Sequence, residues 1–360
     1  MGFTGLDLTV RPYPGHVDPT KVTQDLPPFV NAIRKRGIAV DAITCPITDA
    51  DSPNAEEILS TASSLGITHY WWGTFRYDTT KPVIDQLDAL KPRVEKLEAL
   101  NRKYKMKAMY HTYEGDATVG AAIWDFLYVL KNFDPAYVSF HYDVGHMVVA
   151  GGGNTWALNL RAAGPYIGGV SAKDYTIELN LPLPGGGPYA GQPLGGFGAL
   201  GGRGGRGRGP QGAPEAPGAP AAPGAAPQPP AANNPQPSAP PNSAPESSAQ
   251  AAPGGRGPGR GGRGAFGRGA TPPGRGGGGA PNPYRVKAVP LGDGLANLPE
   301  LAAILKEIHF SGPVEIQAEY PNGGADSAQD HIALPREMVL GAMKRDRLVL
   351  ETAFKQAGLM

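Results

Sequence analysis

Short apolar runs alternate along this chain with longer amphipathic stretches. The runs with the length and composition of strands are 5–10, 38–44, 68–72, 107–111, 138–143, 169–173 and 314–319. The stretches between them have helical periodicity and cover 19–36, 53–65, 80–104, 118–132, 155–165 and 297–308. Such alternation predicts a parallel sheet covered by helices, and this many units favours an α/β fold of the TIM (β/α)8-type barrel.

The predicted strands number seven, one fewer than a closed barrel of this type contains. The chain opens directly on the strand 5–10, with no strand–helix unit before it. A barrel without one unit has two unpaired edges. We therefore expect that the first βα unit is missing because the start is truncated, the alternative being a genuinely seven-stranded or open barrel. We expect a cytoplasmic location by default, and a signal peptide, if there is one, would lie in the missing part.

A low-complexity stretch interrupts the alternation at residues 181–283. Most of the 52 glycines and 39 prolines lie there, together with Arg-Gly repeats at 201–209 and 254–264. Such a composition cannot bury enough apolar surface to offset its ordering entropy, so we predict a disordered insertion. Residues 1–180 and 284–360 then form a single barrel domain. The repeats resemble RNA-binding segments, but few aromatic residues are interleaved, which favours a tolerated loop expansion over nucleic-acid binding.

The overall composition excludes several other classes of protein. A single cysteine, Cys45, rules out an intrachain disulfide and a cysteine-based metal site. The formal net charge of +1 gives no global sign of a nucleic-acid partner. The longest apolar runs are shorter than the roughly 20 residues that a membrane span needs. The oligomeric state is not indicated by any of these features.

Polar residues recur where the predicted strands end. Because the carboxyl ends of parallel barrel strands meet at one mouth, these residues are the candidates for a site. They are Arg11 and His16 after the first strand, His111, Asp143, His146, Lys173, Asp174, and Gln317 and Glu319 on the last strand.

The spacing of these residues suggests roles for some of them. Asp143 and His146, three positions apart, suit a divalent cation or a carboxylate that orients an imidazole. Lys173, with a neighbouring carboxylate at Asp174, suits acid–base work, as does Glu319 at the mouth.

Substrate binding is predicted for Arg11, His16, Asp174 and Trp124. Arg11 and His16 could hold a hydroxyl or carboxylate, and Trp124 could pack against the C–H face of a sugar. A structural role in loops or packing is the alternative reading for each. His141 lies inside a strand, and we expect it to serve packing.

Several segments together resemble one known family. They are Tyr-Asp-Val-Gly-His at 142–146, the Lys173-Asp174 pair, Val-Pro-Leu-Gly-Asp-Gly at 289–294, and Ser-Gly-Pro at 311–313 leading into Glu319. The chain resembles the sugar phosphate isomerase/epimerase family, which has the xylose isomerase-like TIM barrel, over nearly its whole length outside the insertion. In similar sequences a short hairpin joins the strand that ends at Lys173-Asp174 to the segment 289–294. In this chain the insertion takes the place of that hairpin.

The resemblance also implies a metal site. The better-studied epimerases of the family bind a divalent metal through Glu, Asp, His and Glu, and these positions correspond here to His111, Asp143, Ser171 and Gln317. Only the aspartate is kept, and the usual pair of glutamates that moves the proton is absent. The implied cofactor is a divalent Mn, Mg, Zn or Co ion, held by His111, Asp143 and Gln317.

The resulting hypothesis is an enzyme that transfers a proton next to a carbonyl of a sugar or keto-sugar, as an isomerase or epimerase does. The metal or Lys173 would polarise the carbonyl, and Glu319 or His146 would move the proton. One alternative is a lyase or hydratase that acts on 3-keto-glycosides by β-elimination. Another is a non-catalytic protein that binds carbohydrate or, through the insertion, RNA.

Overall fold

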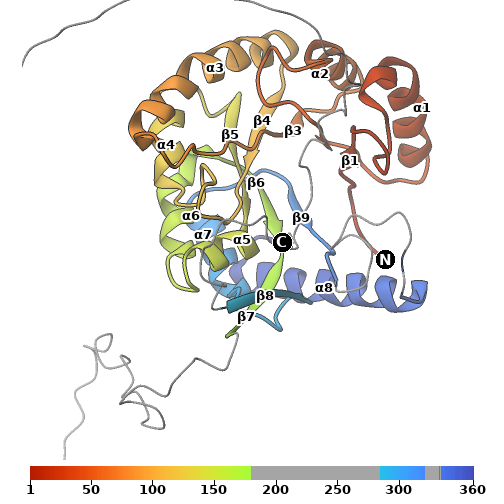
Figure 1. Ribbon diagram of the computed structural model, residues 1–360. Coiled ribbons are helices and arrows are strands. Elements are labelled where there is room, and N and C mark those ends of the chain that lie inside the picture. Colours follow the sequence, from red (N-terminus) through yellow and green to blue (C-terminus); the bar gives the residue numbers. More distant parts are fainter. Residues whose placement is uncertain (180–283, 321–331, 333) are drawn as a thin grey trace, which may run out of the picture. The chain divides into compact units, whose positions relative to one another are not determined.

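Seven parallel strands form one sheet that curls into a half-barrel (Figure 1). The computed structural model describes residues 1–179, 284–320, 332 and 334–360. Within these residues the strand order is β1-β2-β3-β4-β5-β6-β9, and each neighbouring pair is parallel. The strands are β1 (Leu8–Thr9), β2 (Ala42–Thr44), β3 (His69–Trp72), β4 (Lys107–His111), β5 (Val138–Asp143), β6 (Ile167–Ala172) and β9 (Val314–Ile316). The predicted partial TIM barrel is confirmed, with β1 and β9 as its two edges.

The helices follow the strands as the alternation predicted. Those at predicted positions are α1 (Val22–Arg34, preceded by the 3-10 turn Pro19–Lys21), α2 (Ala55–Ser64), α3 (Val83–Tyr104), α4 (Trp124–Leu130), α6 (Trp156–Ala163, followed by the 3-10 turn Gly164–Tyr166) and α7 (Leu298–Glu307). In the part of the chain that the structure describes, no helix is both long and apolar enough to cross a bilayer.

Two helices among the described residues were not predicted from the sequence. Helix α5 (Val144–Ala150) is short and almost entirely buried, so it has no polar face to give it a helical period. Helix α8 (Arg336–Ala357) is long but polar, and few of its side chains, among them Leu350 and Ala353, are buried. Its apolar stripe is therefore too thin to recognise in the sequence.

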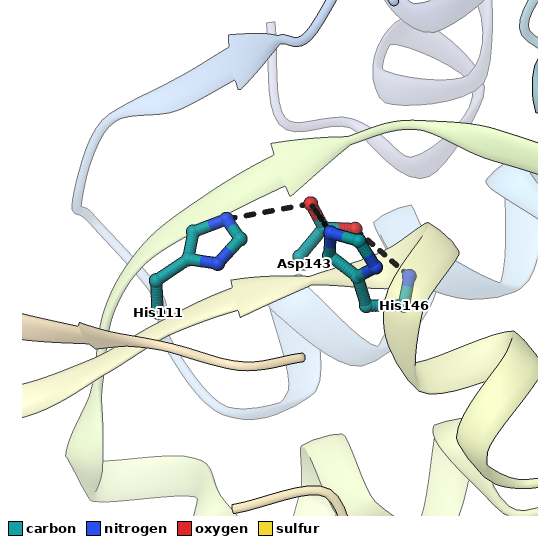
Figure 2. Close-up of side chains that lie close together, drawn as sticks. All are labelled: His111, Asp143 and His146. Atoms are coloured by element: carbon teal, nitrogen blue, oxygen red, sulfur yellow. Dashed lines mark hydrogen bonds and ion pairs between the residues drawn. The ribbon is translucent and has the colours of Figure 1, made fainter. Parts of the chain in front are cut away.

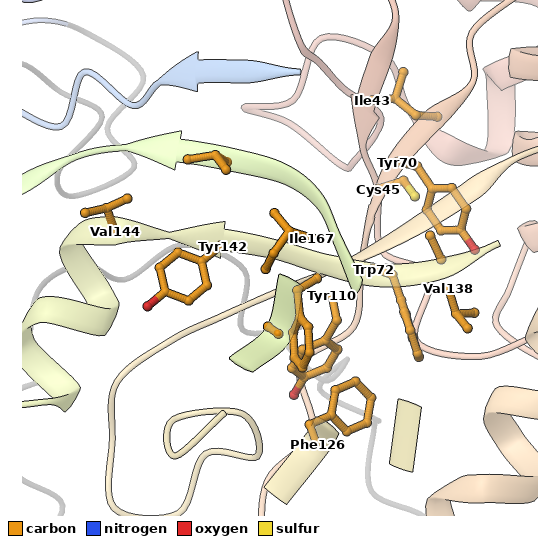
Figure 3. Close-up of a cluster of buried hydrophobic side chains, with 14 of the residues drawn as sticks. Ile43, Cys45, Tyr70, Trp72, Tyr110, Phe126, Val138, Tyr142, Val144 and Ile167 are labelled. Atoms are coloured by element: carbon orange, nitrogen blue, oxygen red, sulfur yellow. The ribbon is translucent and has the colours of Figure 1, made fainter. Parts of the chain in front are cut away.

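Alternation along the strands separates an apolar outer face from a polar inner face. Tyr70 and Trp72 of β3 and Tyr110 of β4 are fully or almost fully buried on the outer face against the helices. The centroid of the Tyr110 ring lies 4.2 Å from the ring centroid of Phe126 on α4 and 5.5 Å from that of Trp72 (Figure 3). Because successive side chains of a strand point to opposite faces, the residues between them point inward. The inner face therefore receives the histidines and carboxylates of the strands.

A two-stranded hairpin follows β6. Its strands β7 (Asp174–Leu179) and β8 (Tyr284–Val289) are antiparallel, and Leu179 pairs with Tyr284. The expectation that the insertion replaces this hairpin was wrong, because both strands are present and paired. The predicted insertion itself, residues 181–283, lies outside the described residues and stays a prediction.

Candidate active site

Side chains from the ends of two strands, β5 and β9, converge on Lys173, which follows β6. Its side chain is only 3% exposed. The Lys173 Nζ lies 3.1 Å from His146 Nε2, 3.1 Å from Glu319 Oε2 and 3.3 Å from Asp143 Oδ2. Four of the residues predicted from their positions at strand ends thus lie together, namely the three predicted catalytic residues and one predicted metal ligand.

Asp143 occupies the junction between β5 and α5. It is the N-cap of the helix, where its Oδ1 accepts a hydrogen bond from the His146 backbone N–H at 2.9 Å. Its Oδ2 lies 3.4 Å from His111 Nε2 and 3.6 Å from His146 Nε2 (Figure 2). Burial works to raise the pKa of Asp143, but His146, Lys173 and His111 outweigh it and hold that pKa well below its usual range. The carboxylate therefore stays ionised although it is fully buried.

His146 is oriented by a carboxylate that the sequence did not identify. Its Nδ1 is paired with Glu114 Oε2, from the loop after β4. Burial raises the pKa of Glu114, but the interaction with His146 outweighs it, so the net shift is downward. With Nδ1 held by Glu114, the ring presents Nε2 to Lys173. A carboxylate–imidazole pair of this kind is the arrangement in which an imidazole is fixed for proton transfer.

Lys173 is a fixed positive charge at the centre of the site. Burial lowers its pKa, but the charges of Asp143 and Glu319 outweigh burial, so the net shift of its pKa is upward. Glu319 also accepts a hydrogen bond from the Tyr175 hydroxyl at 3.4 Å. Lys173 was predicted to be tuned by its neighbour Asp174, whereas its contacts in the structure are with Asp143 and Glu319.

His111 connects this centre to a second polar group on the inner face. Its ring stacks on Trp71 at 4.2 Å, and burial lowers the pKa of His111 to about 3. Its Nε2 lies 3.2 Å from the Gln317 amide nitrogen, which also donates to Ser171 Oγ at 2.8 Å. His111 is therefore neutral at physiological pH.

His141 belongs to the same inner-face network. Its Nε2 lies 2.6 Å from Ser171 Oγ and 2.7 Å from Glu315 Oε1. The ring also lies 4.6 Å from that of Trp71. The prediction that His141 serves packing therefore misses its polar contacts, because its strand position alone does not say which partners face it.

Three of these residues could hold a metal ion. His111, Asp143 and His146 each offer one ligand atom, and these atoms lie within 4.8 Å of one another. Asp143 Oδ2 is buried, and its contacts at 3.3 to 3.6 Å with Lys173, His111 and His146 lack hydrogen-bond geometry. Two imidazoles and a carboxylate are a suitable donor set for a divalent cation. The cluster contains two of the three predicted ligands, while Gln317 lies beside His111.

Asp174 lies next to Lys173 in sequence but has different contacts. Its two carboxylate oxygens accept hydrogen bonds from the backbone N–H groups of Tyr175, Gly292, Gly294 and Ala296, at 2.9 to 3.0 Å. The side chain thus holds the 290–296 loop in place. Its predicted role in substrate binding stays a prediction.

The remaining predicted substrate-binding residues lie elsewhere in the fold. Trp124 begins α4 in the helical layer, is 53% exposed, and donates from Nε1 to Asn159 Oδ1 on α6. Arg11 and His16 lie on the loop after β1, the edge strand farthest along the sheet from β9. The His16 Nδ1 lies 2.7 Å from Thr9 Oγ1. Burial and the Arg11 charge lower the pKa of His16.

Glu114 and Tyr175 are the site residues that sequence reasoning did not assign. Glu114 stands three positions after His111, in the strand-end segment Tyr-His-Thr-Tyr-Glu. Its partner His146 follows a different strand, so no spacing along the chain indicates the pair. The position of Glu114 after a strand was the only available signal.

Comparisons with known proteins agree with this fold. The model of the family described as xylose isomerase-like TIM barrel matches residues 1–192. No curated protein matches the chain significantly.

Solved structures also resemble the chain. They include a xylose isomerase domain protein from Planctomyces limnophilus, with a TM-score of 0.51, 13% identity, and coverage of 100% of this chain and 91% of that one. A D-tagatose 3-epimerase-like protein has a TM-score of 0.52 and 10% identity, with coverages of 99% and 91%. The IOLI protein, with a bound zinc atom, has a TM-score of 0.51 and 9% identity, with coverages of 98% and 90%. At these identities the likeness shows the fold.

Proposed function

The chain belongs to the xylose isomerase-like TIM barrel family, and from this premise we propose that it is an enzyme that moves a proton next to a carbonyl of a sugar or keto-sugar, as an isomerase or epimerase. The proposal rests mainly on the contacts around Lys173. A buried ammonium lies within 3.3 Å of two carboxylates and an imidazole, at the strand ends where barrel enzymes bind substrates.

Each group around Lys173 has a role in such a reaction. The Lys173 ammonium donates a hydrogen bond to the carbonyl oxygen and stabilises the negative charge that develops there as an enediolate forms. Glu319 removes the proton from the neighbouring carbon, and His146 moves the proton between the oxygens or returns it to carbon. Glu114 holds the His146 ring in the orientation that this requires.

A bound divalent cation would be held by His111, Asp143 and His146. When present, it would supply Lewis-acid polarisation of a sugar oxygen. Mn, Mg, Zn and Co are the candidates, and two imidazole ligands favour Zn, Co or Mn over Mg, which prefers oxygen ligands.

A lyase is the second candidate, and the absence of a glutamate pair favours it. The family's two glutamate positions are His111 and Gln317 here. Glu319 and His146 instead form an unlike pair of a carboxylate and an imidazole. A β-elimination on a 3-keto-glycoside uses such a pair, because the carboxylate removes the proton next to the carbonyl and the imidazole protonates the leaving oxygen.

Deuterium exchange tests the proposal and separates these two outcomes. The purified protein is incubated in deuterated water with a panel of neutral ketoses, aldoses and 3-keto-glycosides, and the products are followed by NMR. An isomerase or epimerase incorporates deuterium next to the carbonyl and forms an isomer, whereas a lyase forms an unsaturated ketone. The Lys173→Met variant should lose the exchange. Lys107→Met is the control and should keep it, because Lys107 lies at the opposite end of β4 from His111. Sugars that bind but exchange no proton would contradict the proposal.

The third candidate, a non-catalytic binder, predicts a different result. A variant that lacks residues 185–282 should keep its exchange rate if the protein is an enzyme. An RNA-binding protein should instead lose salt-dependent affinity for RNA on this deletion.

A further inference from the structure

The Lys173 ammonium contacts the same atoms that a metal ion would need. Of the three candidate ligands, Asp143 would offer a carboxylate oxygen and His146 a ring nitrogen. Lys173 Nζ lies 3.3 Å from Asp143 Oδ2 and 3.1 Å from His146 Nε2. His111 is the one of the three that has no such contact with Lys173 within the described residues.

We propose that the Lys173 ammonium occupies the cation position of this site, so that Lys173 and a divalent cation exclude one another. The proposal bears on the reaction proposed above, because it leaves Lys173 or a cation, but not both at once, to polarise the sugar oxygen. Its test measures metal binding and does not depend on activity. Two positive charges a few ångströms apart in a buried site repel strongly, because little water screens them. A cation can therefore bind only after the ammonium has moved away from Asp143.

The tautomer of His146 supports this assignment. A carboxylate only accepts hydrogen bonds, so a neutral His146 ring that pairs with Glu114 through Nδ1 carries its hydrogen there and has its lone pair on Nε2. An ammonium has only hydrogens to donate, so the lone pair of Nε2 accepts one from Lys173. A metal ion would need the same lone pair. The imidazole can thus serve the lysine or the metal, but not both.

Burial and three polar partners hold the Lys173 side chain in its position. Its side chain is 3% exposed, and Glu319 holds it from the side of β9 at 3.1 Å. His111, the remaining candidate ligand, has its Nε2 3.2 Å from the Gln317 amide nitrogen. The lysine therefore has to be displaced from three partners before Asp143 and His146 become available to a metal.

Zinc titration of metal-free protein tests the competition. The proteins are the wild type, Lys173→Met, and Lys107→Met as the matched control, each titrated calorimetrically with Zn²⁺ and then with Mn²⁺. We expect Lys173→Met to bind one Zn²⁺ about 100-fold more tightly than the wild type, on the scale by which neighbouring groups change metal affinity. Lys107→Met should match the wild type. Adding Asp143→Asn to Lys173→Met should abolish the gain.

Thermal unfolding gives a second readout that does not depend on activity. At a Zn²⁺ concentration between the two dissociation constants, Zn²⁺ should raise the unfolding temperature of Lys173→Met and shift that of the wild type little, because stabilisation grows with the ratio of ligand concentration to dissociation constant. If Lys173→Met does not fold without metal, Lys173→Gln is titrated in its place. Stoichiometric, tightly bound metal in the wild type, with no gain in affinity in either variant, would overturn the proposal.

Discussion

The Lys173 Nζ lies 3.1 Å from the Glu319 Oε2, and this ion pair joins residues on either side of the long stretch 180–283. The pairing of β6 with β9 brings them together. Ala172 is in register with Ile316, so the chain that follows each strand leaves the sheet at the same end. Glu319 thus supplies one of the two carboxylates that neutralise a buried ammonium.

Replacement of Glu319 tests its role as the base. We expect Glu319→Gln to reduce the rate of deuterium exchange about 10²- to 10⁴-fold, because an amide cannot accept the proton. Exchange is followed by NMR with the best substrate of the panel. Glu178→Gln, on the hairpin, is the control because its carboxylate forms an exposed pair with Arg285. Exchange at the wild-type rate in Glu319→Gln would assign the proton transfer to another group.

Glu114 is expected to act through His146 rather than on the substrate. Glu114→Gln should lower kcat about 10- to 100-fold and leave KM nearly unchanged, because loss of an orienting partner costs this much in comparable sites. The measurement is steady-state kinetics. The control is Asp116→Asn, an exposed carboxyl of the same loop. A large rise in KM with unchanged kcat would show instead that Glu114 contacts the substrate.

The hydrophobic periodicity of the sequence predicted much of this fold, because periodicity depends only on residues that are close together along the chain. Strands β4 and β5 have the predicted bounds, and each of the other predicted strands of the sheet is present. The rule that strand ends gather at one mouth correctly brought Asp143, His146, Lys173 and Glu319 together. Both inferences need only the order of elements along the chain.

Contacts between side chains could not be predicted in this way. Lys173 and Asp174 are neighbours in sequence, but successive residues of an extended chain point in opposite directions. Lys173 therefore faces Asp143, whereas Asp174 faces the backbone of the 290–296 loop. The Glu114–His146 pair was missed because it depends on how the loop after β4 packs against α5.

The buried imidazole of His111 should make stability depend on pH. Burial lowers its pKa to about 3, whereas an unfolded histidine has a pKa of about 6.5. Between these values the unfolded chain binds a proton that the folded protein does not. The free energy of unfolding should therefore fall as the pH is lowered from 6.5 towards 3, by up to about 1.4 kcal/mol per pH unit from this group.

Urea unfolding of His111→Asn at pH 7, 6 and 5 checks this expectation. The variant should show a shallower loss of stability with falling pH than the wild type. His309→Asn, which replaces an exposed histidine, should keep the wild-type slope. Equal slopes in all three proteins would show that His111 does not resist protonation in the folded state.

Asp174 provides the last test, because its predicted and observed roles differ. Asp174→Ala leaves four backbone N–H groups without their acceptor, at about 1–3 kcal/mol each when buried, so we expect a loss of about 4 kcal/mol or more. Asp174→Asn keeps one acceptor oxygen and should lose about half as much. Asp293→Ala, which removes an exposed pair with Arg345, should lose less than about 1 kcal/mol.

Denaturant unfolding and kinetics together separate the two roles of Asp174. An anchor of the 290–296 loop affects stability first, so KM of Asp174→Asn should stay near the wild-type value at a temperature where the variant is folded. A substrate ligand has the opposite signature, because its loss raises KM while a carboxylate that faces solvent contributes little to stability. The four backbone amides that surround Asp174 use both of its oxygens, which leaves neither free for a sugar hydroxyl. A rise in KM without a loss of stability would therefore require the loop to open when substrate binds.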